Sequence, residues 1–174
     1  MSRKLDYVVS GTSYMRFSNP GIAKDETNSQ IINMLIDKLV TDVHSHKFSM
    51  LYNGHTESSF GDRFTAYKDH VHEIHADSGG LQIVTQGMTI TDELKDKVYE
   101  NQAQWADVGM CFDEIPVVLT GDRSDRNDTK ARFFDFENYE ELARKTGRNV
   151  KRQLEIFDKA NSKCKPYIIL QGNC

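Results

Sequence analysis

The stretch VHEIHADSGGLQIV, residues 71–84, decides how this chain is expected to fold. EIHA has the character of a strand end, and it leads directly into Asp77. Ser78 and the glycine pair Gly79-Gly80 follow before the apolar residues resume. A turn needs only one glycine. Two glycines beside a carboxylate indicate that the backbone carries no side chains here, so that a flat group can lie against it.

Helix and strand patterns alternate on both sides of this stretch. Apolar spacing predicts a helix from about Thr91, a buried strand at VGMCF (108–112) leading into Asp113, a long helix over 139–157 with a bend at Gly147, and a strand at YIIL (167–170) leading into Gln171. Upstream, we expect strands at LDYVV (5–9) and KFSMLY (47–52), with a helix from Asn28 between them. This alternation favours an α/β fold with a parallel sheet and right-handed crossovers.

Length and composition point to a single globular domain over residues 1–174. The chain is 38% hydrophobic and 28% charged, without repeats or an obvious linker. No apolar run approaches the roughly 18 residues of a membrane helix, and the N-terminus lacks the apolar core of a signal peptide. The three cysteines are far apart and form no CxxC pair, which indicates free thiols. We therefore expect a cytoplasmic protein with no membrane contact.

Polar residues follow three of the predicted strands, at the point where each strand ends. They are Asp77, Asp113 and Gln171. Because ligands of parallel α/β folds bind beyond the carboxyl ends of the strands, we expect the three to line one pocket, within about 12 Å of one another. Two carboxylates and an amide suit a planar ligand with both donors and acceptors, such as guanine. One carboxylate would then remain for acid or base chemistry.

Short motifs around these residues resemble those of the tRNA-guanine transglycosylases, also called queuine tRNA-ribosyltransferases. ADSGGLQ (76–82) resembles the family's DSGG(F/Y)Q motif, MCFDEIP (110–116) its FDE segment, and IILQGN (168–173) its VQGG or VQGS strand end. ARKTGRNVKRQ (143–153) is similar to the basic helix that precedes that strand. The motifs occur in the family's order, and the resemblance covers about residues 70–173.

The resemblance implies a (β/α)8 TIM barrel, here truncated after the strand that ends at Gln171. It also implies the exchange of guanine in tRNA or DNA for a 7-deazaguanine, as in queuosine-type modification, by double displacement through a covalent sugar–enzyme intermediate. Asp77 would be the catalytic acid/base group, and Asp113 would bind the amidine edge of the base. Gln171 would bind the carbonyl side of the base. The pocket would be shaped by Ser78, Gly79, Gly80 and Gly172.

Two departures from the family motifs indicate a distant branch. Leu81 stands where the family usually has an aromatic residue that stacks on the base, and Ile115 stands where the tRNA enzymes commonly have a cysteine. Phage enzymes that insert deazaguanines into DNA belong to the same wider group, so the substrate is DNA or tRNA, with a slight preference for DNA. The expected location is the cytoplasm of a bacterium or a phage-infected host cell.

The length of the chain is short for a complete enzyme of this kind. An eight-stranded barrel takes roughly 250 residues, and the family's nucleophilic aspartate and structural zinc site would lie beyond Cys174. We therefore expect a fragment, half of a split enzyme or a relative that has lost catalysis, with no nucleophile, metal or cofactor in this chain. The expected partner is either a second copy, in a homodimer, or a missing C-terminal half. Without a following helix, the strand YIIL should expose apolar surface.

Two other functions are compatible with the sequence. All six histidines fall between His44 and His75, and the HxH pairs His44/His46 and His70/His72 would suit a metal-dependent TIM-barrel hydrolase. A non-catalytic nucleobase or nucleic-acid binding protein would use the same pocket without a nucleophile. The positive charge concentrated between Arg123 and Arg152 fits either a solvated helix face or phosphate contact.

Overall fold

The computed structural model describes residues 8–9, 49–55, 71–86, 88–114, 117–120, 130–134 and 138–169. The chain divides into two compact units: Met1–Tyr52 with Ser59–His75, and Asn53–Ser58 with Ala76–Cys174. The helix predicted from Asn28 lies outside the described residues, and so do Gln171 and Gly172.

The main sheet gives the fold its α/β character. Its strands are β1 (Val8–Val9), β2 (Ser49–Asn53), β3 (Ile74–Asp77), β4 (Val108–Met110) and β7 (Lys165–Tyr167), and their hydrogen-bonded order is β1-β2-β3-β4-β7. β1 pairs with β2 in parallel, and β4 pairs with β7 in parallel from Val108 opposite Lys165 to Met110 opposite Tyr167. The predicted parallel α/β arrangement is therefore confirmed.

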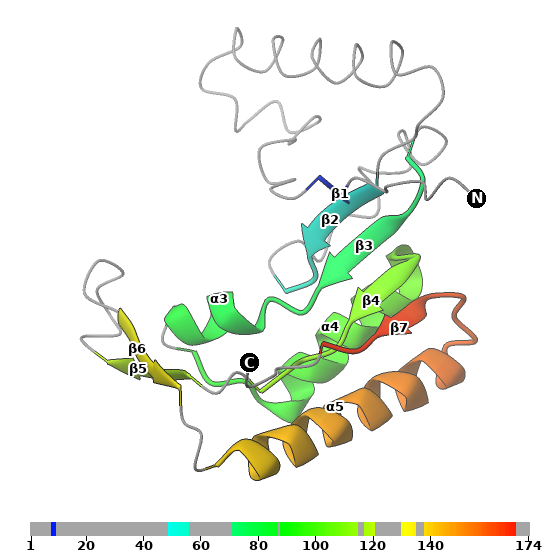
Figure 1. Ribbon diagram of the computed structural model, residues 1–174. Coiled ribbons are helices and arrows are strands. Elements are labelled where there is room, and N and C mark those ends of the chain that lie inside the picture. The colour runs from blue at the N-terminus through cyan, green and yellow to red at the C-terminus, as the bar shows by residue number, and fades with distance from the viewer. Residues whose placement is uncertain are drawn as a thin grey trace, which may run out of the picture. The chain divides into compact units, whose positions relative to one another are not determined.

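Two long helices of the second unit cover strands β4 and β7. α4 (Asp92–Trp105) packs against β4, α5 (Tyr139–Lys159) packs against β7, and the two helices pack against each other (Figure 1). α4 begins at its N-cap Thr91, whose side-chain hydroxyl accepts a hydrogen bond from the Leu94 N–H at 3.3 Å. α5 ends before Asn161, which adopts a left-handed conformation with φ 49°.

Three features differ from the pattern predicted from sequence. α5 continues through Gly147 as one uninterrupted helix. The last strand is Lys165–Tyr167 rather than YIIL, because these residues are the ones that pair with β4. A short helix, α3 (Gly80–Thr85), and an antiparallel pair, β5 (Val117–Thr120) with β6 (Lys130–Phe134), were not predicted. The β5–β6 pair interrupts the simple strand–helix alternation between β4 and α5.

Buried glutamines connect the two helices to the strands of the second unit. The Gln102 side-chain amide of α4 donates to the Met110 carbonyl at 2.9 Å and to the Ala76 carbonyl at 3.3 Å. Gln153 of α5 donates to Gln102 Oε1 at 2.8 Å and to the Gly109 carbonyl at 3.0 Å. Because both side chains are fully buried, these bonds fix the positions of α4 and α5 relative to the strand ends.

The end of the described chain carries exposed apolar side chains. Tyr167 is 58% exposed and Ile168 is 53% exposed, so the predicted apolar surface is found in the first two residues of YIIL. Among the described residues, no helix is both long enough and apolar enough to cross a membrane.

Candidate functional site

The turn after β3 is built by hydrogen bonds among its own residues. Asp77 ends β3, and its carboxylate accepts backbone hydrogen bonds from Ser78 and Gly79. The Ser78 hydroxyl, which is 2% exposed, accepts a hydrogen bond from the Gly80 N–H at 3.3 Å, at the first residue of α3. Short polar side chains that bond to the backbone one or two residues ahead are typical turn formers. The DSGG sequence therefore specifies this turn locally.

Of the glycine pair, Gly79 is required by its surroundings within the second unit, whereas Gly80 is not. Gly79 has φ 74°, and a Cβ there would lie 2.6 Å from the side-chain oxygen of Asn53. A Cβ on Gly80 would lie 3.5 Å from Cδ1 of Phe112, an ordinary contact. The space beside Gly79 is thus filled by an amide side chain of the same protein. The conformation and this close approach both require glycine at position 79.

Asn53 is a member of this site that the sequence predictions missed. It ends β2, and its side-chain nitrogen donates to Gln82 Oε1 at 2.6 Å while its oxygen accepts from the His55 N–H at 2.9 Å. The Gly54 N–H donates to the Asp77 carbonyl at 2.9 Å, which joins the ends of β2 and β3. The signal was available, since Asn53 follows a predicted strand just as Asp77 and Asp113 do.

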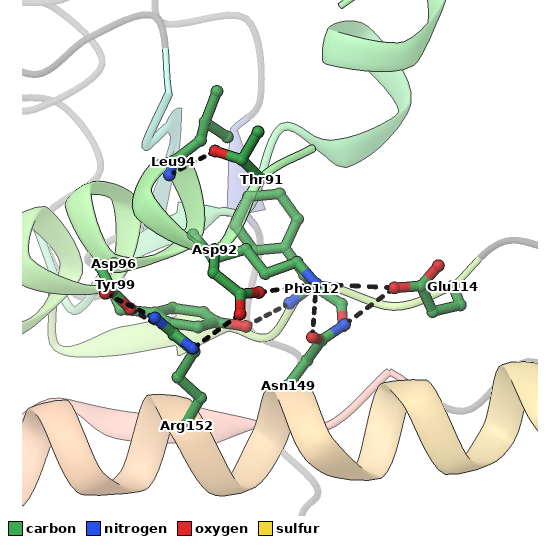
Figure 2. Close-up of polar contacts among 10 residues, drawn as sticks. Thr91, Asp92, Leu94, Asp96, Tyr99, Phe112, Glu114, Asn149 and Arg152 are labelled. Atoms are coloured by element: carbon green, nitrogen blue, oxygen red, sulfur yellow. Dashed lines mark hydrogen bonds and ion pairs between the residues drawn. The ribbon is translucent and has the colours of Figure 1, made fainter. Parts of the chain in front are cut away.

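Asp113 lies beyond β4, in a segment whose backbone is held from both sides by the helices. The Phe112 N–H donates to the Tyr99 hydroxyl of α4 at 3.1 Å, and the Phe112 carbonyl accepts from the Asn149 side chain of α5 at 2.9 Å (Figure 2). The Glu114 N–H donates to the Thr146 hydroxyl at 2.9 Å. The peptide groups flanking Asp113 are therefore fixed by three distant side chains.

The surroundings of this segment are apolar on one side and polar on the other. The rings of Tyr99 and Phe112 meet edge to face with centroids 5.6 Å apart, and both side chains are buried. Asn149, only 4% exposed, also donates to Glu114 at 3.2 Å (Figure 2). Its side-chain oxygen accepts from the Lys95 ammonium at 2.7 Å. The Asn149 amide therefore connects the backbone beside Asp113 to the partly buried Lys95.

Asp77 and Asp113 interact electrostatically. Burial is the main cause that raises the pKa of Asp77, the backbone hydrogen bonds from Gly79 and Ser78 oppose that shift, and the negative charge of Asp113 adds to it. Burial also raises the pKa of the Cys111 thiol, and Asp113 contributes in the same direction. A carboxylic acid that gives up its proton less readily, beside a second carboxylate, is a suitable arrangement for proton transfer.

The other predicted site residues have different surroundings. Leu81 is 55% exposed on α3, close in sequence to the turn. His44, His46 and His70 lie outside the described residues, whereas His72 is exposed and His75 Nε2 lies 3.4 Å from a carboxylate oxygen of Glu73. Within the described ranges, no group of three or more histidine, cysteine or acidic side chains is arranged to hold a metal ion.

Comparison with known proteins gives no match for this chain, whether with family models, with curated proteins or with solved structures. Its function must therefore be inferred from the residues and geometry described above.

Proposed function

We propose that this chain carries the base-recognition part of a guanine transglycosylase, an enzyme that exchanges guanine in a polynucleotide for a 7-deazaguanine. The observation that supports this most is the pair of carboxylates, Asp77 at the end of β3 and Asp113 beyond the end of β4, whose charges interact. In parallel α/β folds this edge of the sheet is where ligands bind. The resemblance of the motifs to those of the tRNA-guanine transglycosylases supports guanine as this ligand.

In this proposal the two carboxylates have different roles. Asp113 accepts hydrogen bonds from N1–H and the exocyclic amino group of guanine, because an ionised carboxylate offers acceptors only. Asp77, whose pKa is raised chiefly by burial, exchanges a proton near the reacting glycosidic bond. Ser78, Gly79 and Gly80 hold the turn that carries Asp77, and Gln171 with Gly172 completes the base pocket.

The same proposal includes the complete barrel fold and the polynucleotide substrate. The parallel strands and covering helices would form part of a (β/α)8 barrel whose remaining strands come from a second copy of this chain or from another polypeptide segment. The nucleophile and a structural zinc site would lie in that remainder. The substrate would be DNA or tRNA, with a slight preference for DNA.

Exchange of labelled guanine into DNA and tRNA, by this chain alone and together with the partner that completes the barrel, tests the proposal. Asp113→Asn should weaken guanine binding by about 2–4 kcal/mol, because the asparagine amide presents donors to the donors of the base. Asp77→Asn should leave guanine binding intact and reduce turnover by roughly 100-fold or more, because it removes the titrating proton.

Three outcomes would contradict this assignment. Unchanged guanine affinity in Asp113→Asn would remove Asp113 from the base edge. Guanine binding without exchange on either polynucleotide would favour a nucleobase-binding protein. Activity that is lost with a chelator, restored by zinc and abolished by His44→Ala would favour the metal-dependent hydrolase.

A further inference from the structure

A charged cleft lies next to the segment that carries Asp113. It has a volume of about 600 Å³ and is lined by Asp92, Lys95, Glu114, Lys145, Arg148, Asn149, Lys151, Arg152 and Glu155. Five of these side chains are cations and three are carboxylates, although the whole chain has a net charge of -4. Positive charge is therefore concentrated here in an otherwise acidic protein.

Two of the cations are held in place by the protein itself. Lys95 is 11% exposed, donates to Asn149, and lies 3.8 Å from Glu114 and 4.0 Å from Asp92. Arg152 donates to both carboxylate oxygens of Asp96 through Nε and Nη2, and to Asp92 through Nη1 at 3.1 Å (Figure 2). These pairs line the cleft and compensate two of its carboxylates, Asp92 and Glu114.

The other three cations can change partners at little cost. Lys145, Arg148 and Lys151 are exposed on α5. Arg148 pairs with Glu141 at 3.2 Å and Lys151 with Glu155 at 3.9 Å, and both pairs are solvent-exposed. Exposed ion pairs contribute about 0–1 kcal/mol, so a more highly charged anion can replace the carboxylates.

The dimensions and place of the cleft suit a polymer of anions. Its lining on α5 runs from Lys145 to Glu155, about 15 Å along a helix axis at about 1.5 Å per residue. Each strand of B-DNA carries one phosphate per about 3.4 Å of axis, so several phosphates fit along this length. Glu114, in the lining, directly follows Asp113, the residue assigned to the base.

We propose that this α4–α5 cleft binds the phosphodiester backbone of the polynucleotide through Lys145, Arg148 and Lys151. This inference rests on the proposed function, because Asp113 must hold a base of the same polynucleotide. The contacts are electrostatic and independent of base sequence, and they orient the strand while Asp113 selects the base.

The test measures how the affinity of the full chain for a labelled DNA oligonucleotide and for an unmodified tRNA transcript depends on salt. The variant Lys145→Gln/Arg148→Gln/Lys151→Gln is compared with Lys97→Gln/Lys159→Gln/Lys163→Gln, which removes the same charge from exposed lysines outside the cleft lining. The cleft variant should bind at least about 10-fold more weakly at low salt and reduce the slope of log K against log salt by about 2–3. The control should change the slope by less than about 1.

The outcomes separate this inference from the proposed function. Equal slopes for the cleft and control variants, or no binding of either polynucleotide by the parent, would overturn the cleft assignment. A larger effect of the cleft variant on one polynucleotide would support the assignment and identify that polynucleotide as the ligand. The protein could also bind the polynucleotide through the cleft and yet exchange no guanine. That outcome would reject the transglycosylase function and would still support a phosphate-binding site in the cleft.

Discussion

The two segments that carry the candidate carboxylates are held in place by different means. The turn at Asp77 is stabilised within four residues, by hydrogen bonds from Ser78 and Gly79 to the carboxylate and from Gly80 to Ser78. The segment at Asp113 is held by Tyr99, Thr146 and Asn149, which are 13 to 37 residues away from their partners. A local motif can therefore specify the first segment, whereas the second depends on the packing of α4 and α5.

The largest effect is expected for Gly79→Ala, in the locally specified turn. Alanine at φ 74° is strained, and its Cβ would lie 2.6 Å from Asn53 Oδ1. We expect a loss of about 2–4 kcal/mol in the free energy of unfolding, measured by urea denaturation. Gly147→Ala is the matched control, because a Cβ there meets nothing within 4 Å and should stabilise α5 by about 0.5–1 kcal/mol. Equal effects at both glycines would mean that the turn does not need glycine.

Asn149→Leu tests the segment held by distant residues. It leaves the Phe112 carbonyl and the Lys95 ammonium without their bonds to the amide, and the expected loss in unfolding free energy is about 2–3 kcal/mol. Guanine affinity should fall with it, because the Phe112 carbonyl beside Asp113 loses its hydrogen bond to α5. Asn149→Asp keeps the acceptor for Lys95 and loses the donor to Phe112, so it separates the two contributions. Unchanged guanine affinity in both variants would show that Asp113 needs no support from α5.

Tyr99→Phe is a finer test of the same segment. It keeps the edge-to-face ring contact with Phe112 and removes only the hydroxyl that accepts from the Phe112 N–H. The expected loss is about 1–2 kcal/mol, because the N–H remains buried without this partner. Tyr167→Phe, at a 58% exposed side chain, should change the unfolding free energy by less than about 0.5 kcal/mol. A smaller loss of unfolding free energy for Tyr99→Phe than for this control would show that Tyr99 does not hold the segment at Asp113.

The smallest effect concerns the pH dependence of stability. Because burial raises the folded-state pKa of Asp77, this group stabilises the fold most below its unfolded pKa, and that contribution is lost as pH rises through the folded pKa. A tenfold difference in acidity between the folded and unfolded states corresponds to about 1.4 kcal/mol. Asp77→Asn should therefore gain stability relative to the parent as pH rises through the acid range, in thermal melts. A constant difference between the two proteins at every pH would contradict this shift.

Sequence patterns predicted the elements with strong local signals. Apolar spacing located α4, α5, the strand that ends at Asp77 and the strand that ends before Asp113, and Thr91 was correctly expected to mark the start of α4. The glycine pair of DSGG was expected to keep the backbone slim for a flat group, whereas the structure shows Gly79 at φ 74° with the Asn53 side chain beside it. The rule of polar residues at strand ends would also have found Asn53.

Long-range contacts decided the rest. The sequence by itself determined the α/β alternation and the Asp77 turn, because these depend on the spacing of apolar residues and on bonds between near neighbours. Only the tertiary structure decided that Asn53 fills the space beside Gly79, that β7 begins at Lys165, and that Asn149 reaches the Phe112 carbonyl. These contacts join residues 26 to 57 positions apart, as in Asn53 with Gly79 and Val108 with Lys165, and no local pattern records such pairings. The physical reason is that a buried amide gains a partner only when the fold brings one to it.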